Sequence, residues 1–198
     1  GVITNITPDH LDRYSSFSDY ISSKLSIYKY CQFSTVNLDV DLANGVDGDN
    51  YYGIESSNLR CDFIAKQNGN TYEVFHKGNR LITSDDLKVV GRHNIENLLA
   101  ALTLGYRFGL SLKVMTQAAI DFKGLEHRLE FVSTINNIDY YNDSKSTNAI
   151  STITAINALF EKYNNLTLIA GGISKKEDYS ELFKLINEKV NAVVLIGE

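Results

Sequence analysis

Two polar clusters, separated by a short apolar passage, hold charged and amide side chains at spacings suited to ligand binding. The first is Glu126-His127-Arg128, and the second is NDSKSTN at 142–148. The apolar passage predicts a β-hairpin, because β-branched and aromatic residues flank an Asn136-Asn137 turn. Helical patterning resumes at Thr147. A polar cluster between a strand end and a helix start lies where α/β folds place their ligands.

Within the second cluster, Asp143 and Lys145 supply one charge of each sign at the same helix start. Unpaired backbone N–H groups at that start favour an anion. A simpler interpretation is a helix N-terminus capped by Ser144 or Asn142, with its charges in solvent. The local sequence alone favours the simpler interpretation, so the rest of the chain has to decide.

A second candidate site is Asp9-His10-Leu11-Asp12, at a predicted strand-to-helix junction. A histidine beside carboxylates can bind a divalent ion or orient a base. A histidine that simply caps a helix start is commoner. Lys24 follows fourteen residues after His10 on a predicted helix, and by itself it is an ordinary amphipathic lysine.

Two further clusters follow predicted elements. Asn94 and Asn97 lie three residues apart and share one face of a helix start, where their carboxamides can read a purine edge. Residues 168–172 form an apolar strand that ends in glycines, and Lys175 follows in position for an anion. Neither cluster is a Walker A loop, since the 198 residues contain no G-x-x-x-x-G-K-[ST].

Composition narrows the class of protein. A hydrophobic content of 43% and a charged content of 22% are those of an ordinary soluble globular protein. The net charge of −5 argues against a nucleic-acid or anionic-membrane partner, and no apolar run approaches the ~20 residues that span a bilayer. Cys31 and Cys61 are too few for a disulfide framework, so we expect reduced thiols and a cytoplasmic location.

The elements that must position these clusters follow from hydrophobic periodicity. The chain opens and closes inside an α/β pattern, so we expect it to be a piece of a longer protein. Strands alternating with helices after residue 138 predict a parallel sheet. The expected elements are a strand at 2–6, a helix at 18–30, a strand at 33–38, antiparallel strands from 51 to 83, helices at 94–108 and 112–122, the hairpin, a helix at 147–163, a buried strand at 166–170, a helix at 178–190 and a buried strand at 192–196.

Each cluster is weak alone, but their order is specific. NITPDHLDRY with SSKLSIY, then GRHNIENLLAAL, GLEHRLEFV, NDSKSTN and LIAGG followed by Lys175, resembles the Mur ligase family across essentially all 198 residues. The combination EHRLE with NDSKSTN is most similar to the branch that joins D-glutamate to UDP-N-acetylmuramoyl-L-alanine in peptidoglycan synthesis. The tripeptide-forming relatives carry a DYAH-type sequence in the second motif.

The resemblance implies an α/β fold in two parts. Residues 1–124 correspond to the C-terminal half of a central ATP-binding domain, a mixed sheet with helices plus a small antiparallel sheet. Residues 125–198 correspond to the first part of a Rossmann-like C-terminal domain that binds the amino acid, and the two meet at a Lys123-Gly124 hinge. We expect the UDP-sugar domain, the phosphate loop, the other magnesium-ligating glutamate and the C-terminal end to be absent, which would leave this chain inactive alone.

The resemblance also implies roles for the clusters. The family uses ATP and Mg²⁺ to phosphorylate a UDP-substrate carboxylate, which the amine of D-glutamate then attacks. The implied catalytic residues are Lys24, His10 and Lys145, with His10 and a carbamylated Lys24 as metal ligands. The implied nucleotide contacts are Asn94, Asn97, Arg128 and Asp143, and those with D-glutamate are Thr147 and Lys175.

We expect a monomer that has these two substrates as its partners and binds neither nucleic acid nor membrane. Three alternatives stay open at this point. They are another Mur ligase, a folylpolyglutamate synthase that shares the ATPase plan, and a non-catalytic nucleotide-binding module that keeps only the fold.

Overall fold

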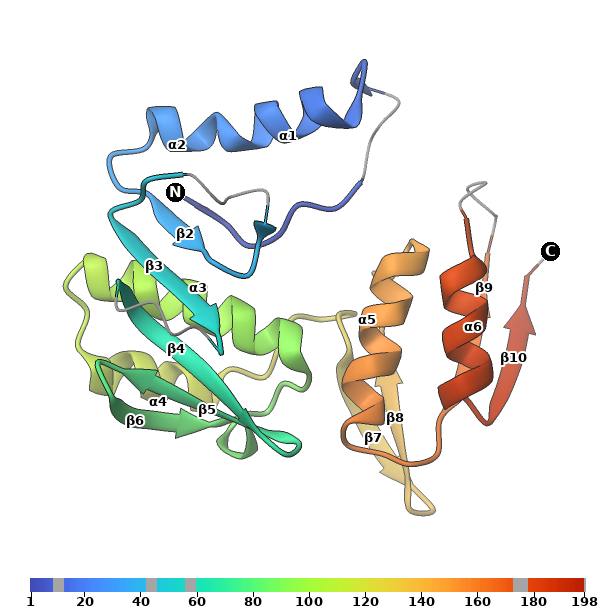
Figure 1. Ribbon diagram of the computed structural model, residues 1–198. Helices are drawn as coiled ribbons and strands as arrows, with labels where there is room; N and C mark the ends of the chain where they lie inside the picture. Colours follow the sequence, from blue (N-terminus) through green and yellow to red (C-terminus); the bar gives the residue numbers. More distant parts are fainter. Residues whose placement is uncertain (9–12, 42–45, 56–59, 173–177, 198) are drawn as a thin grey trace. The chain divides into compact units, whose positions relative to one another are not determined.

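The computed structural model describes residues 1–8, 13–41, 46–55, 60–172 and 178–197 (Figure 1). Contacts between Cα atoms divide the chain into two compact units. Unit 1 combines Gly1–Asp86 with Ile95–Asp121, and unit 2 combines Leu87–Asn94 with Phe122–Glu198. The segment 87–94 therefore packs with the C-terminal part of the chain, although its last three residues begin a helix whose remainder belongs to unit 1.

Unit 1 is built on a six-stranded sheet whose strands follow one another in chain order. The first four strands run parallel to one another. The fifth runs antiparallel to the fourth, and the sixth antiparallel to the fifth, so the sheet is mixed, as the sequence predicts. The strands are β1 (Val2–Ile3), β2 (Thr35–Asn37), β3 (Asn50–Ile54), β4 (Cys61–Asn68), β5 (Thr71–His76) and β6 (Asn79–Thr83).

The pairing of β3 with β4 corrects the prediction of antiparallel strands throughout 51–83. Tyr51 pairs with Cys61 and Ile54 with Ala65, so these two strands are parallel, and β5 and β6 extend the main sheet. The prediction failed because the six residues 55–60 are a short connection, typical of a hairpin. The burial of four successive residues of β3, 51–54, fits a parallel strand that is covered on both faces.

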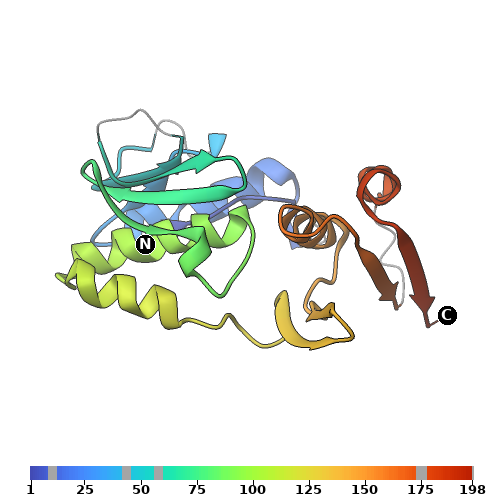
Figure 2. The same cartoon turned by 90° about the horizontal axis from the view of Figure 1, so that it is seen from below.

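Helices α3 (Arg92–Arg107) and α4 (Leu112–Asp121) lie on the same side of this sheet, with α3 against it (Figure 2). The Tyr106 ring at the end of α3 lies 5.7 Å from the Phe63 ring of β4 and 4.6 Å from the His76 ring of β5. Gly109, at φ +80°, ends α3 as predicted. The backbone N–H of Val114 bonds to the predicted cap Ser111.

On the N-terminal side, the predicted helix at 18–30 is broken in two. The helix α1 (Phe17–Leu25) starts at the N-cap Ser16, and α2 (Ile27–Tyr30) follows after Ser26. The Tyr28 hydroxyl accepts a hydrogen bond from the backbone N of Ile3 at 3.2 Å and donates one to the O of Thr35 at 3.1 Å. A single side chain from α2 thus ties β1 to β2.

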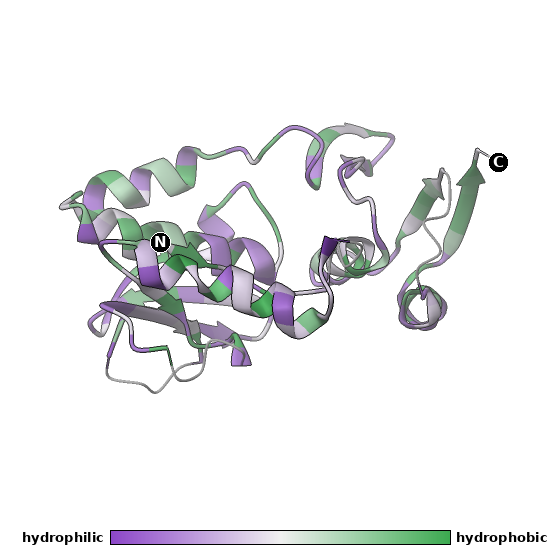
Figure 3. Ribbon diagram, turned by 90° about the horizontal axis from the view of Figure 1, so that it is seen from above, coloured by the Kyte–Doolittle hydropathy of each residue, from purple (hydrophilic) through white to green (hydrophobic). Residues whose placement is uncertain are grey.

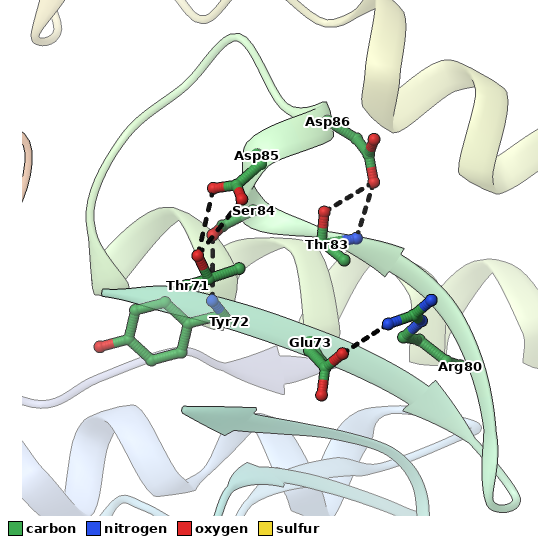
Figure 4. A network of polar contacts seen from close by, with 8 residues as sticks. All are labelled: Thr71, Tyr72, Glu73, Arg80, Thr83, Ser84, Asp85 and Asp86. Atoms are coloured by element: carbon green, nitrogen blue, oxygen red, sulfur yellow. Dashed lines mark hydrogen bonds and ion pairs between the residues drawn. The ribbon is translucent and has the colours of Figure 1, made fainter. Parts of the chain in front are cut away.

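A polar network closes the antiparallel end of the sheet (Figure 4). The short helix η3 (Ser84–Asp86) folds back so that Asp86 accepts hydrogen bonds from the backbone N and hydroxyl of Thr83, at 2.9 and 2.8 Å. These bonds hold the pKa of Asp86 below its ordinary value. Arg80 of β6 pairs with Glu73 of β5 at 2.7 Å. The network fixes the point at which the chain leaves unit 1.

Unit 2 contains an antiparallel hairpin, two helices and a pair of parallel strands. Asn136 and Asn137 have φ values of 52° and 62°, so the hairpin turn has both central residues left-handed, as in a type I′ turn. Ala149, Ile156 and Leu182 form its core. The elements are β7 (Glu130–Ile135), β8 (Ile138–Asn142), α5 (Ala149–Phe160), β9 (Thr167–Gly171), α6 (Ser180–Lys189) and β10 (Ala192–Ile196).

The last strand contradicts the predicted burial. Figure 3 shows β10 as hydrophobic along its length, yet all five of its residues are exposed, and Leu195 keeps 79% of its surface. Ile169 of β9 is 61% exposed. Among the described residues, α5 and α6 supply the apolar partners of β9, and β10 adds no side chain to that core. No helix in the described parts of the chain has the length and apolar character needed to cross a membrane.

We predict that Leu99→Ala, in α3, destabilises unit 1 by about 2–5 kcal/mol, because this fully buried side chain leaves a cavity under the sheet. The measurement is urea unfolding followed by the near-UV signal of the tyrosines. Val114→Ala on α4 is the matched control, since Val114 is 60% exposed and its truncation should cost less than about 0.5 kcal/mol. Equal effects of the two substitutions would contradict the packing of α3.

Candidate functional site

The β7–β8 hairpin brings the two predicted polar clusters together. Its register pairs Glu130 with Asn142 at the open end, so the residues before β7 meet those after β8. The backbone N of Leu129 donates to the Asp143 Oδ1 at 2.9 Å, and the backbone N of Lys145 donates to the O of His127 at 3.1 Å. We call residues 126–129 and 142–146 the double loop.

The backbone of the double loop is strained at two places. His127 has a φ of 65° and Leu129 a φ of 44°, both in the left-handed region that ordinary side chains seldom adopt. Each such residue costs about 1–2 kcal/mol relative to a right-handed one. The strain persists because hydrogen bonds hold it: the backbone N of His127 donates to the Glu130 Oε2 at 2.8 Å, and that of Leu129 donates to Asp143.

This arrangement fixes the backbone on both sides of Arg128. Its own backbone N donates to the O of Leu125 at 3.2 Å, and its side chain is exposed. Asp143 is half-buried, and its backbone O accepts from the N of Ser146 at 2.8 Å, which closes a tight turn. Lys145 lies in that turn and is exposed. The structure therefore brings Arg128, Asp143 and Lys145 together at one end of the hairpin.

The cap of the next helix differs from both residues suggested by the sequence. Asn148 is the N-cap of α5, with its Oδ1 accepting from the N of Ser151 at 2.8 Å. Asn142 instead accepts from the N of Ser144, at 3.1 Å, inside the double loop. The helix begins at Ala149 rather than at Thr147, so Thr147 is an exposed residue just before the cap.

The two asparagines that were predicted to contact the nucleotide have different surroundings at the start of α3. The Asn94 Nδ2 donates to the O of Val90 at 2.8 Å, so its amino group stabilises the first turn of the helix. Asn97, one turn later, is exposed. Asn94 belongs to unit 2 by its contacts and Asn97 to unit 1, although both lie on one continuous helix.

The segment before α3 approaches helix α5 closely. A Cβ atom built on Gly91, which has a φ of 90°, would lie 2.3 Å from the Cβ of Ala158 and 3.1 Å from the Cε1 of His93. Burial lowers the pKa of His93, and the negative charge of Asp143 offsets part of that effect. Gly91 is therefore a position at which unit 2 needs the smallest residue.

The comparison with known families decides what these features belong to. Residues 1–105, more than half of the chain, match the family described as the Mur ligase middle domain. The chain belongs to the Mur ligase family. It is 36% identical over 201 residues to a UDP-N-acetylmuramoylalanine–D-glutamate ligase of Marinobacter nauticus, and 38% identical over 207 residues to that of Psychrobacter cryohalolentis. All of the chain is covered in both, but it spans only 45% and 44% of those relatives.

Solved structures of Mur ligases share its fold. A UDP-N-acetylmuramate–alanine ligase of Thermotoga maritima gives a TM-score of 0.71 at 17% identity, over the whole chain and half of that protein. A MurF of Acinetobacter baumannii gives 0.72 at 18%, over the whole chain and 46% of that protein. A folylpolyglutamate synthase complex gives 0.67 at 18%, over 98% of the chain and half of that protein. The fold alone thus does not separate the branches.

Of the metal-binding pair implied by the Mur ligase resemblance, Lys24 falls within the described residues and His10 lies outside them. Lys175, the implied contact with D-glutamate, also lies outside the described residues. Lys24 is exposed in the last turn of α1, and its Nζ lies 5.2 Å from the centre of the Tyr20 ring. The described residues contain no group of three His, Cys, Asp or Glu side chains able to hold a metal, so they do not by themselves make a magnesium site.

Two residues that position the ends of the parallel strands were missed by the sequence analysis. Asn37 is 1% exposed; its Nδ2 donates to the O of Thr4 at 2.9 Å, and its Oδ1 accepts from the N of Asp39 at 3.0 Å. The Asp39 Oδ2 accepts from the N of Ile54 at 2.7 Å. Together they tie the carboxyl ends of β1, β2 and β3. The available signal was a buried-type strand that ends in an amide, followed two residues later by a carboxylate.

We predict that Gly91→Ala destabilises unit 2 by about 1–3 kcal/mol more than Gly124→Ala, because only the first places a methyl group against Ala158. The pair is matched: Gly124 has a φ of 91°, and a Cβ there would meet Val89 at an ordinary 3.4 Å. Both variants therefore carry the same backbone strain, and their difference isolates the close approach. Thermal unfolding of both variants measures that difference, and equal losses would contradict the contact.

Proposed function

We propose that this chain is part of an ATP-dependent ligase that joins D-glutamate to UDP-N-acetylmuramoyl-L-alanine in peptidoglycan precursor synthesis. The observation that carries the proposal is the double loop. It holds Arg128 and Asp143, from EHR and NDSK, in one hydrogen-bonded structure. The sequence relatives at 36% and 38% identity, both named D-glutamate ligases, support the choice of amino acid.

In this proposal, residues 1–124 are part of the central ATP-binding domain and residues 125–198 are the first part of the C-terminal domain. A carboxylate oxygen of the UDP-substrate attacks the γ-phosphorus of ATP, and ADP leaves. The amine of D-glutamate then attacks the acyl carbon, phosphate leaves, and the amine loses a proton as the carbon–nitrogen bond forms. Magnesium, when bound, neutralises negative charge on the phosphates.

The contacts of the described side chains limit what each can do for the nucleotide. Asn94 uses one N–H of its amino group on Val90, which leaves its second N–H to donate and its Oδ1 to accept a hydrogen bond from the nucleotide. Asn97 is exposed and can use both ends of its carboxamide. Asp143 accepts from Leu129 with Oδ1, and its Oδ2 is suited to a ribose hydroxyl. The Arg128 guanidinium supplies positive charge.

The remaining roles are assigned to residues around the helix start. Lys145 lends positive charge to the phosphates or to the tetrahedral intermediate, which concentrates negative charge. Thr147, next to the cap of α5, and Lys175 hold the α-carboxylate of D-glutamate. Lys24, as a carbamate, and His10 hold magnesium, because oxygen donors suit this hard cation. We further propose that the protein is monomeric and cytoplasmic.

The test is product formation by the protein that contains this chain together with the parts its relatives carry outside the matched region. With ATP, magnesium, UDP-N-acetylmuramoyl-L-alanine and D-glutamate, we expect ADP, phosphate and a product identified by its mass. L-Glutamate should not replace D-glutamate. The 198-residue chain alone, which has no Walker A sequence, should give no product. Turnover of a folate substrate, or of another amino acid in preference to D-glutamate, would overturn the proposal.

We predict that Lys24→Ala in that protein lowers turnover by on the order of 10²-fold or more, because the metal loses an anionic ligand. Its stability should stay within about 0.5 kcal/mol, since the side chain is exposed. Acetate added to the assay should restore part of the activity by supplying the missing carboxylate. Lys29→Ala, at an exposed lysine of α2, is the matched control and should be unchanged. Full activity of Lys24→Ala without acetate would remove Lys24 from the site.

A further inference from the structure

We infer that His127 is a positioning residue: as a neutral imidazole with its proton on Nε2, it locks the double loop and so presents Arg128 to the nucleotide. The tautomer follows from the hydrogen bonds alone. The consequence for nucleotide binding rests on the proposed function, in which Arg128 is a nucleotide contact.

The orientation of one amide decides the tautomer. The backbone N–H of Ser144 donates to the Asn142 Oδ1 at 3.1 Å, so the oxygen of that amide points into the turn. Rotating the amide by 180° would place its NH₂ group against the same N–H, and two donors would face each other. The amide is therefore fixed with Nδ2 on the other side.

That side faces the imidazole of His127. The Asn142 Nδ2 lies 2.9 Å from the His127 Nδ1. An amide NH₂ can only donate, so Nδ1 must accept and cannot carry a proton. The proton of the neutral ring is then on Nε2. An imidazolium, which has protons on both nitrogens, would again set two donors against each other.

Glu130 is the acidic side chain that could draw a proton to Nδ1, and its contacts show why it does not. The Glu130 Oε2 lies 3.8 Å from Nδ1, beyond hydrogen-bond distance. The same oxygen accepts from the backbone N of His127 at 2.8 Å. Glu130 thus holds the backbone of His127, and Asn142 holds its ring.

Three polar atoms of His127, its backbone N and O and its ring Nδ1, are held by residues of the double loop or by Glu130 beside it. Its N–H donates to Glu130, its carbonyl accepts from Lys145, and its ring faces Asn142. Arg128 is the next residue, and Leu129 beyond it is held by Asp143. Since His127 and Leu129 are both left-handed, release of either would let the backbone at Arg128 relax to a commoner conformation. The ring of His127 therefore sets the direction in which the side chain of Arg128 projects from the backbone.

Substitutions can distinguish the effect of the hydrogen bond from the effect of having any side chain at position 127. In His127→Asn, the new Oδ1 occupies roughly the place of Nδ1, accepts from Asn142, and asparagine tolerates a left-handed backbone. His127→Ala removes the acceptor. Asn142→Asp keeps an acceptor for Ser144 but turns the donor that faces Nδ1 into a second acceptor, so the imidazole proton must move to Nδ1.

The direct test is ¹⁵N NMR of the imidazole nitrogens in the 198-residue chain, at about pH 8 where a free imidazole is neutral. The chain has four histidines, and the spectrum of His127→Asn identifies the signals of His127. We expect an unprotonated Nδ1 and a protonated Nε2 in the native chain, and a protonated Nδ1 in Asn142→Asp. A protonated Nδ1 in the native chain would overturn the inference.

The functional arm uses the ligase that contains this chain and measures KM for ATP separately from kcat. We expect His127→Ala to raise KM for ATP about 10-fold, and His127→Asn to stay within about 3-fold of the native value. An unchanged KM in His127→Ala would overturn the positioning role while leaving the proposed function intact. If the native ligase made no product, the proposed function would fail, and the NMR measurement would still decide the tautomer.

Discussion

The register of the β7–β8 hairpin is the constraint on which the candidate site depends. Its Asn136-Asn137 turn has two left-handed residues, which fixes a two-residue connection and sets Ile135 opposite Ile138. A register shift between Phe131 and Ser133 then moves the pairing by one residue, so that Glu130 pairs with Asn142 at the other end. That pairing sets Asp143 within 2.9 Å of the Leu129 N–H. A slip of one residue would turn the side chains to the opposite face and separate these groups. The turn and the register shift together thus determine the geometry at the open end of the hairpin.

The double loop also shows how polar groups can support a strained backbone without glycine. His127 and Leu129 have side chains that disfavour positive φ, yet each has its backbone N–H on a carboxylate, Glu130 for the first and Asp143 for the second. Hydrogen bonds to charged acceptors are stronger than those between neutral groups, so they can offset the strain. Glycine at position 127 would remove the strain there but also the side chain that faces Asn142.

Local features of this fold were predictable from the sequence, and features set by long-range pairing were not. The hairpin, the end of α3 at Gly109 and the cap at Ser111 depend on neighbouring residues, and the structure confirms them. The parallel pairing of β3 with β4 depends on which faces are covered, which a six-residue connection does not reveal. In the site, the order of the motifs could be read from the sequence. The hydrogen bond between His127 and Asn142 is visible only in the structure.

The segment 87–94 makes the division into units discontinuous along the sequence, because it belongs to unit 2 while the residues on both sides of it belong to unit 1. A division at residue 124 assigns all of α3 to the first part of the chain, but the contacts assign Arg92, His93 and Asn94 to unit 2. Gly91 allows this because its missing side chain leaves room for Ala158 of α5. Since α3 is one continuous helix from Arg92 to Arg107, Asn94 and Asn97 keep a fixed spacing of one turn across the boundary.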